Sequence, residues 1–264
     1  MYLPEKIQKY IVGESYKTDT IGMSGSSVFL YKERVLKVQD VNGEAENEYH
    51  MLQFLQGRLP VPRVYAYEIE NGKSYMLMDR MTGLMACARE YMENPVMQCK
   101  MLADGLKKLW QTDIIGCPSD QRLKNKLERA KYNVENGLVD LENAESGTFG
   151  ERGFGSPENL LEWLYDNKPE EEPVLSHGDY CLPNLFGRKE QTTGYIDLTR
   201  AGVADKWCDI ALCCRSLSEN GLQGNRMDGD FAGLECNSVG LFRELGIEPD
   251  WGKIRYYILL DELF

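Results

Sequence analysis

Several features are scarce or missing in this chain of 264 residues, and each argues against a class of protein. Basic residues are outnumbered, with 30 Lys and Arg against 42 Asp and Glu, so the net charge is −12. A nucleic-acid-binding protein needs clustered Lys and Arg to neutralise phosphates, as does a protein held at an anionic membrane surface, so we expect neither partner. No stretch approaches the ~20 apolar residues of a membrane span. The net negative charge favours a cationic small molecule or a metal–nucleotide complex as the binding partner.

Signals for secretion are also missing. The eight cysteines contain no CxxC pair, and the opening residues MYLPEKIQKYIVGES contain no apolar run that could serve as a signal peptide. In a chain of this length without a secretory signal, reduced and buried thiols are expected rather than disulfides. The cysteine spacing does not support a zinc site. We therefore expect a cytoplasmic protein.

The hydrophobic pattern changes character near residue 82. Before it, short β-rich runs alternate with turns and with one helix, and after it long helical patterns surround a strand-and-loop island at 174–198. The sequence therefore predicts an α+β protein with a sheet-rich N-terminal lobe, 1–82, and a larger, mainly helical C-terminal lobe, 83–264. The expected strands are 18–21, 28–31, 34–38, 63–70 and 74–78, and the expected helices are 44–56, 95–111, 120–136, 156–167, 205–219, 230–245 and 250–263.

Two charged residues occupy positions where the pattern favours apolar ones. Glu48 falls on the apolar stripe of the 44–56 helix, and Lys37 lies among apolar residues on the preceding strand. A carboxylate on a buried stripe is costly unless a cation meets it. Each residue could be satisfied locally, the lysine by reaching the sheet edge and the glutamate by capping. However, a Gly- and Ser-rich turn, 22–27, followed by Lys37 and then Glu48 is the order of a kinase-type Lys–Glu pair that holds nucleotide phosphates.

A second group of polar residues lies in the strand-and-loop island. In SHGDYCLPNLF, Asp179 and Asn184 are five residues apart, and Asp197 follows on the apolar strand predicted at 194–198. Phosphoryl transfer to a hydroxyl needs a carboxylate that orients the hydroxyl and accepts its proton. It also needs an amide and a second carboxylate that hold Mg²⁺ against the phosphate oxygens. The D-x4-N spacing followed by a strand Asp matches the order of these groups in kinases.

Each of these motifs also has a structural interpretation. The turn at 22–27 alone could be an ordinary hairpin, and Asn184 alone could be a turn residue. We interpret His177 as a hydrogen-bonded structural residue. Asp209 opens a helical pattern, so we interpret it as a helix N-terminal stabiliser or a loop anchor. The kinase interpretation rests on the order of the four motifs along the chain.

Three segments resemble the aminoglycoside 3′-phosphotransferases, the kanamycin kinase family. They are SHGDYCLPNLF, YIDLTRAGVADKWCDIALCCRSL and the ending PDWGKIRYYILLDELF, and the resemblance runs from about residue 20 to the C-terminus. The HGD-x4-N and IDL motifs also occur in choline, homoserine and fructosamine kinases, whereas RAGVADKW and LLDELF are more specific. The resemblance implies a two-lobed protein-kinase-like fold, with a small antiparallel sheet plus one helix and a larger helical lobe.

The resemblance also implies an activity, its cofactors and a set of site residues. The activity is phosphorylation of an aminoglycoside hydroxyl, the 3′-OH of kanamycin- and neomycin-type drugs, which gives antibiotic resistance. The cofactors are ATP, with GTP left open as a donor, and Mg²⁺. Asp179 would orient and deprotonate the sugar hydroxyl, and Asn184 and Asp197 would bind magnesium. The nucleotide would be held by Ser24, Lys37 and Glu48, and by the connector residues Asp79 and Met81.

The antibiotic site implied by the resemblance is acidic. Independently of it, Asp261, Glu262 and the α-carboxylate crowd three negative charges into the last four residues, and they repel one another unless a cation lies nearby. A frayed, solvated terminus is the alternative. The residues implied to contact the drug are Glu142, Glu145, Asp179, Arg200, Glu219, Glu262 and Phe264 with its carboxylate.

Two other functions remain open at this stage. A small-metabolite kinase of the same fold, acting on choline, homoserine or a sugar, would share the HGD-x4-N chemistry. A non-catalytic kinase-fold scaffold would lack one or more of the base, the metal ligands or the lysine, and the sequence has all of them. The sequence does not distinguish a monomer from a homodimer.

Overall fold

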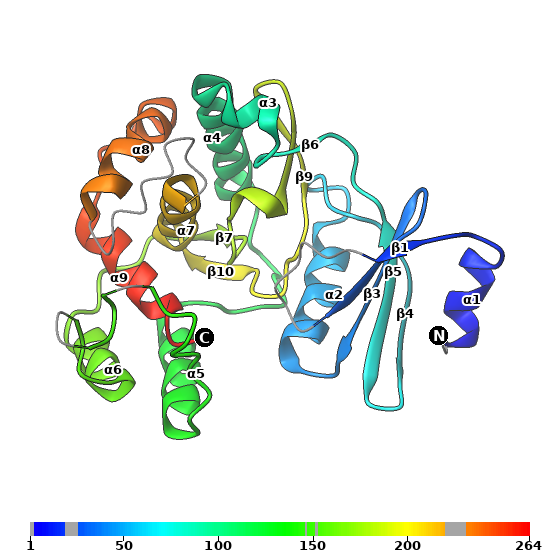
Figure 1. Ribbon diagram of the computed structural model, residues 1–264, viewed down its shortest axis with the longest axis horizontal. Helices are drawn as coiled ribbons and strands as arrows, with labels where there is room; N and C mark the ends of the chain where they lie inside the picture. The colour runs from blue at the N-terminus through cyan, green and yellow to red at the C-terminus, as the bar shows by residue number, and fades with distance from the viewer. Residues whose placement is uncertain (1–2, 19–25, 146, 151–152, 220–230) are drawn as a thin grey trace.

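A five-stranded antiparallel sheet lies at one end of the molecule, and a helical lobe lies at the other (Figure 1). The computed structural model describes residues 3–18, 26–145, 147–150, 153–219 and 231–264, without the side chains of 231–233 and 236. The strand order in the sheet is β1-β2-β3-β5-β4. These strands are β1 (Lys17–Thr18), β2 (Ser27–Leu30), β3 (Arg34–Asp40), β4 (Val64–Glu70) and β5 (Lys73–Asp79).

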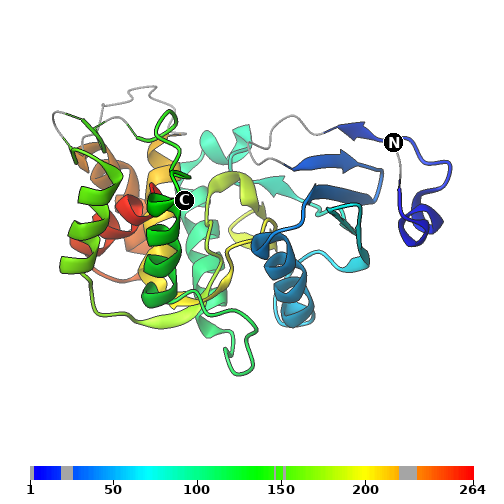
Figure 2. The same cartoon turned by 90° about the horizontal axis from the view of Figure 1, so that it is seen from below.

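Each face of the sheet packs against one helix. Because side chains alternate between the two faces of a strand, Leu36 of β3 joins the apolar cluster under helix α1 (Glu5–Ile11). Its neighbour Lys37 points to the other face, which packs against helix α2 (Gly43–Leu55). The Asn42 side chain caps α2 by accepting a hydrogen bond from the Ala45 N–H at 2.8 Å. Figure 2 shows α2 on the side of the sheet nearest the helical lobe.

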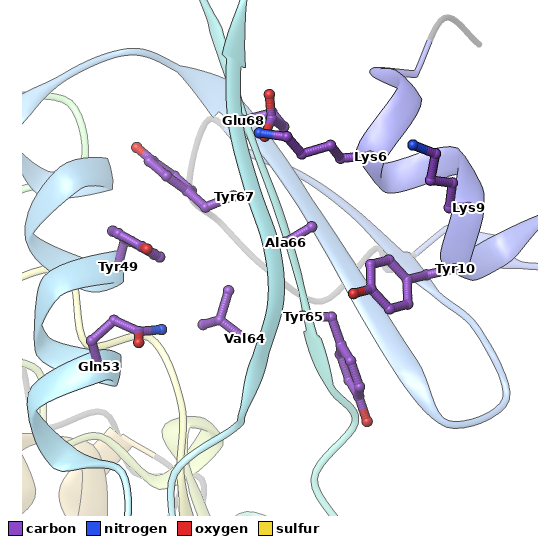
Figure 3. A pocket seen from close by; sticks show the side chains of 10 residues that line it. All are labelled: Lys6, Lys9, Tyr10, Tyr49, Gln53, Val64, Tyr65, Ala66, Tyr67 and Glu68. Carbon is purple, nitrogen blue, oxygen red and sulfur yellow. The ribbon is translucent and has the colours of Figure 1, made fainter.

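A surface hollow follows the outer edge of the sheet at β4. Its volume is about 480 Å³, and side chains from α1 and α2 line it on either side of the strand (Figure 3). Tyr49 of α2 stacks on Tyr67 of β4, with ring centroids 4.3 Å apart. None of the site residues expected from the sequence lines this hollow.

Helix α7 forms the centre of the helical lobe. Ten of its side chains are buried, and it packs against both neighbouring helices, α8 and α9. The helices of this lobe are α3 (Arg89–Met92), α4 (Pro95–Gln111), α5 (Leu123–Glu135), α6 (Pro157–Asp166), α7 (Lys206–Glu219), α8 (Phe231–Leu245) and α9 (Trp251–Asp261). Among the described helices, none is both long and apolar enough to span a bilayer.

Two small antiparallel sheets flank the loop that contains Asp179. The first pairs β7 (Pro173–Ser176) with β10 (Gly202–Asp205). The second has the order β6 (Leu84–Met85), β8 (Leu185–Arg188) and β9 (Gln191–Tyr195). A short 3₁₀ turn, η1 (Leu182–Asn184), precedes β8. The loop that contains Asp179 therefore lies between β7 and η1.

The predicted α+β, two-lobed architecture is confirmed, with three corrections. The sheet packs against two helices instead of one, because α1 was missed; it is seven residues long and offers only Ile7 and Ile11 as buried residues. The strand expected at 194–198 ends at Tyr195, because Asp197 adopts a left-handed backbone with φ +58°. Strands β6 and β10 and the one-turn helix α3 were not predicted. Most of the strand expected at 18–21 lies outside the described residues, and the lobe boundary at 82/83 stays a prediction.

Candidate active site

Lys37 lies at the centre of an ion-pair network between the two lobes. Its Nζ atom is 2.8 Å from Glu48 Oε2 and 3.0 Å from Asp197 Oδ1. Lys37 is 6% exposed and Glu48 is 1% exposed, so the pair is shielded from water. Burial favours the neutral amine, but the two carboxylates outweigh it and hold the pKa of Lys37 above its usual range. The lysine therefore remains a fixed positive charge beside Asp197.

Helix α2 is attached to the chain that follows Asp197. Asn47 Nδ2 donates to the carbonyl oxygens of Thr199 and Ala201, each at 2.9 Å. One turn earlier, Glu44 Oε1 is 3.1 Å from Arg200 Nε. Positions 44, 47 and 48 share one helix face, so the face that meets Lys37 also contacts the helical lobe. The position of Glu48 is thus set by contacts to both lobes.

The carboxylate of Asp179 is held by two donors from its own loop. Asn184 Nδ2 donates to Asp179 Oδ2 at 2.7 Å, and Cys181 Sγ donates to Asp179 Oδ1 at 2.9 Å. Burial raises the pKa of the Cys181 thiol well above its usual value. Asp179 itself is half-buried. The two predicted groups of the D-x4-N motif are therefore in direct contact.

Asp209 anchors the start of the same loop. It is fully buried and accepts hydrogen bonds from Ser176 Oγ at 2.9 Å, the His177 N–H at 2.8 Å and the Gly178 N–H at 2.9 Å. His177 is also fully buried, and its Nδ1 accepts a hydrogen bond from the Asp179 N–H at 3.3 Å. These contacts support the interpretation of Asp209 as a loop anchor and of His177 as a structural residue.

Asp197 and Asn184 lie on adjacent segments. The Ile196 N–H donates to the Asn184 carbonyl at 3.0 Å, which ties the chain beside Asp197 to the D-x4-N motif. The Lys37 charge outweighs the effect of burial and holds the pKa of Asp197 below its usual value. Asn184 uses its Nδ2 on Asp179, and within the described part of the chain its amide oxygen accepts no hydrogen bond from the protein. A carboxylate and an amide oxygen fit Mg²⁺, which binds few protein ligands and completes its shell with waters and phosphate oxygens. Within the described ranges, no group of three or more His, Cys, Asp or Glu residues forms a metal cluster.

Gly178 is required by the tight packing of this loop. Its φ is +81°, and an added Cβ would collide with the carbonyl oxygen of Arg200. We expect Gly178→Ala to lower kcat about 100-fold, because displacing the loop misplaces Asp179. Gly116→Ala is the matched control, since Gly116 has φ +76° with nothing within 4 Å of its added Cβ. The control should lose only about 1 kcal/mol of stability and no activity. Equal kcat values in the two variants would contradict the packing argument.

An acidic cluster surrounds Arg215 near the C-terminus. Arg215 forms an ion pair with Asp261, and its Nη1 and Nε atoms lie 3.6 Å from Glu262 and 3.7 Å from Glu145. Glu262 Oε2 also accepts the Glu145 backbone N–H at 2.9 Å. Burial and the neighbouring carboxylates raise the pKa of Glu262 to about 7. Burial also raises the pKa of Glu145. Arg200 also pairs with Asp261, so two guanidinium groups face three carboxylates, and negative charge is in excess when all three are ionised.

Arg200 joins this cluster to helix α2. Its Nη1 is 3.1 Å from Asp261 Oδ1, while its Nε contacts Glu44 of α2. The guanidinium lies 5.4 Å from the centre of the Phe264 ring, as does that of Arg129. The C-terminal residue is therefore docked against the lobe, and the alternative of a frayed terminus is wrong.

The other expected site residues lie apart from these contacts. Glu142 is exposed in the loop before α6, and Glu219 is exposed at the end of α7. The Asp79 side chain accepts hydrogen bonds from Tyr65 and from the Arg63 N–H, so it stabilises the connector. Among the described residues, the Met81 N–H has no acceptor and remains free for a ligand. Ser24 lies outside the described residues.

Sequence reasoning missed four residues that shape the site. They are Glu44 and Asn47 on α2, Cys181 beside Asp179, and Arg215 on α7. Arg215 carried a usable signal, because it is a charge within the otherwise apolar run DIALCCRSL, as Glu48 is on its own helix. The other three are polar residues at half-exposed positions, where patterning indicates no partner.

Comparison with known proteins gives consistent results. The model of the phosphotransferase enzyme family matches residues 18–249. The aminoglycoside 3′-phosphotransferases of Enterococcus faecalis and Staphylococcus aureus are each 36% identical to this chain, with 100% of the chain and 99% of each relative covered. The crystal structure of a type VIII aminoglycoside 3′-phosphotransferase, 27% identical, aligns with a TM-score of 0.75 over 98% of this chain and 96% of that one. At 23% identity, an aminoglycoside phosphotransferase from Streptomyces rimosus has a TM-score of 0.79, with the same coverage, and supports the fold alone.

Proposed function

The chain belongs to the phosphotransferase enzyme family and within it to the aminoglycoside 3′-phosphotransferases, and from this premise we propose that it transfers a phosphoryl group from ATP to the 3′-hydroxyl of an aminoglycoside. The observation that carries the proposal is the contact of Lys37 with both Glu48 and Asp197, because it joins the predicted phosphate-binding pair to a predicted metal ligand. A cytoplasmic location, ATP and Mg²⁺ are parts of the same proposal.

The residues divide the chemistry between them. Asp179 orients the drug hydroxyl and accepts its proton as the oxygen forms a bond to the γ-phosphorus and the bond to the ADP oxygen breaks. Lys37 holds the phosphates, and its charge stabilises the negative charge of the leaving group. Asn184 and Asp197 would hold Mg²⁺, which when bound neutralises charge on the phosphate oxygens. The free N–H of Met81 would donate a hydrogen bond to the edge of the adenine ring.

The acidic cluster around Arg215 supports a cationic substrate. Three carboxylates meet the two guanidinium groups of Arg215 and Arg200 there, and an aminoglycoside carries several ammonium groups that would complete the charge balance. Glu142 and Glu219 lie on the exposed surface and would add negative charge at the rim of the drug-binding site. The Streptomyces rimosus phosphotransferase, which shares the fold, was solved in complex with ADP and streptomycin.

Two measurements test the function and its position on the drug. Susceptible cells that express the chain should survive higher concentrations of kanamycin but show no protection against gentamicin C compounds, which lack a 3′-hydroxyl. With the purified protein, coupled detection of ADP should show turnover with kanamycin and none with choline. Turnover of choline without kanamycin would instead favour the small-metabolite kinase.

Glu262 gives the proposal a pH-dependent test. The pKa of Glu262 is about 7 in the folded state, above the ordinary value of 4.5. Glu262 therefore contributes stability to the fold below pH 4.5, where it is neutral, and this stability is lost as the pH rises from 4.5 to about 7. We expect Glu262→Gln to raise Tm at pH 8, to leave Tm unchanged at pH 4, and to raise the KM for kanamycin at pH 8 about tenfold through loss of an ammonium contact. The exposed Glu248→Gln is the control and should change neither value. A lower Tm at pH 8, or an unchanged KM, would contradict this role of Glu262.

A further inference from the structure

The thiol of Cys181 lies against the catalytic carboxylate. Its Sγ atom is 2.9 Å from Asp179 Oδ1, closer than an ordinary thiol hydrogen bond requires. The backbone around it is fixed, because the Cys181 N–H donates to the Asp179 carbonyl at 2.9 Å and the Asn184 N–H donates to the Cys181 carbonyl at 3.0 Å. The next residue is tied to α7, since the Leu182 N–H donates to Ser216 Oγ at 3.0 Å. The loop therefore holds the thiol in place.

The thiol and an amide divide the two carboxylate oxygens between them. Cys181 donates to Oδ1 of Asp179, and Asn184 donates to Oδ2 at 2.7 Å. A carboxylate group rotates easily about its bond to Cβ, because that torsion is broad, so two donors on opposite oxygens are needed to fix its plane. Each carboxylate oxygen has about two acceptor positions. Among the described residues Oδ1 accepts only the Cys181 S–H, so one of its positions is open to a substrate hydroxyl.

We propose that Cys181 is a positioning residue for phosphoryl transfer, whose S–H group holds the Asp179 carboxylate in the orientation that accepts the hydroxyl proton. The inference rests on the proposed function. It assigns no covalent step to the sulfur, and no contact between Cys181 and the nucleotide. Loss of the donor should therefore affect turnover and leave nucleotide binding unchanged.

Three substitutions separate the donor from the volume of the side chain. Cys181→Ala removes both, Cys181→Val fills the space without a donor, and Cys181→Ser restores a donor. We expect kcat with kanamycin to fall about tenfold in the alanine and valine variants, since a hydrogen bond to a charged group is lost. The serine variant should stay within about threefold of wild type. The KM for ATP should change less than about twofold in all three.

Cys99→Ala is the matched control. Cys99 is a buried thiol on α4 beside Gly240 and contacts none of the proposed catalytic residues within the described part of the chain. This variant should lower Tm and leave kcat unchanged, which separates loss of core packing from loss of positioning.

The outcomes are distinct. A wild-type kcat in Cys181→Ala, or equal losses in the serine, alanine and valine variants, would overturn the positioning role. If alanine fails to fold, the comparison of valine with serine still decides the question. A wild-type protein that turns over no aminoglycoside would remove the proposed function itself, whereas an active wild type with an indifferent Cys181 would remove only this inference.

Discussion

Asp179→Asn is expected to lower kcat roughly 10²- to 10⁴-fold, the range that a general base contributes. The amide preserves the shape of the side chain but cannot accept the hydroxyl proton. Nucleotide affinity should change less than about twofold, because no contact joins Asp179 to Lys37 or to the connector at Met81 among the described residues. Steady-state assays with kanamycin give kcat, and calorimetric titration with an ATP analogue gives the affinity.

A matched control for this substitution is Asp166→Asn. Asp166 is exposed at the end of α6 and lies in none of the contacts described for the site. The control should retain wild-type kcat, Tm and nucleotide affinity. Near wild-type turnover in Asp179→Asn would remove this carboxylate from the mechanism. A parallel loss of nucleotide binding would show instead that the substitution disturbs the whole loop.

Asp209→Ala is expected to cost roughly 3–5 kcal/mol of folding free energy, because each buried donor that is left without an acceptor costs about 1–3 kcal/mol. The substitution leaves Ser176 Oγ and the N–H groups of His177 and Gly178 without their acceptor in a fully buried position. For a chain of this size, a loss of that order lowers Tm by about 10 °C. Activity should fall as well, because the same loop carries Asp179.

Asp250→Ala provides the contrast. Asp250 accepts a hydrogen bond from the Lys253 N–H at 3.0 Å and caps α9 at an exposed position. Losing this cap should cost about 1 kcal/mol. Thermal unfolding followed by circular dichroism compares the two variants. Equal shifts in Tm would contradict the anchoring role of Asp209.

Sequence patterning predicted the helices of the larger lobe well. The expected helix 95–111 coincides with α4, which is long and apolar on one face. The expected helix 205–219 starts one residue before α7, which is long and buried on nearly all sides. The short α1 and the four-residue strand β10 were missed. A segment of that length contains too few turns or alternations to show a period.

The candidate site was only partly predictable for a related physical reason. Lys37 and Glu48 could be paired from sequence, since each is a charge at a buried position and isolated burial is costly. The bonds of Asn47 to Thr199 and Ala201 join residues more than 150 positions apart. Asparagine on a half-exposed helix face carries no comparable cost, so nothing in its own segment identifies the partner. The left-handed backbone of Asp197 could not be predicted either, because Asp adopts that conformation at little cost and the sequence therefore carries no signal for it.

The docking of α2 has a consequence for how the enzyme would be controlled. In many protein kinases, phosphorylation of an activation loop sets whether the equivalent helix and its Lys–Glu pair are in position. Here Asn47 and Glu44 fix that helix through unmodified side chains and main-chain carbonyls of the same polypeptide. In this structure the Lys37–Glu48 pair is therefore assembled without phosphorylation of a loop.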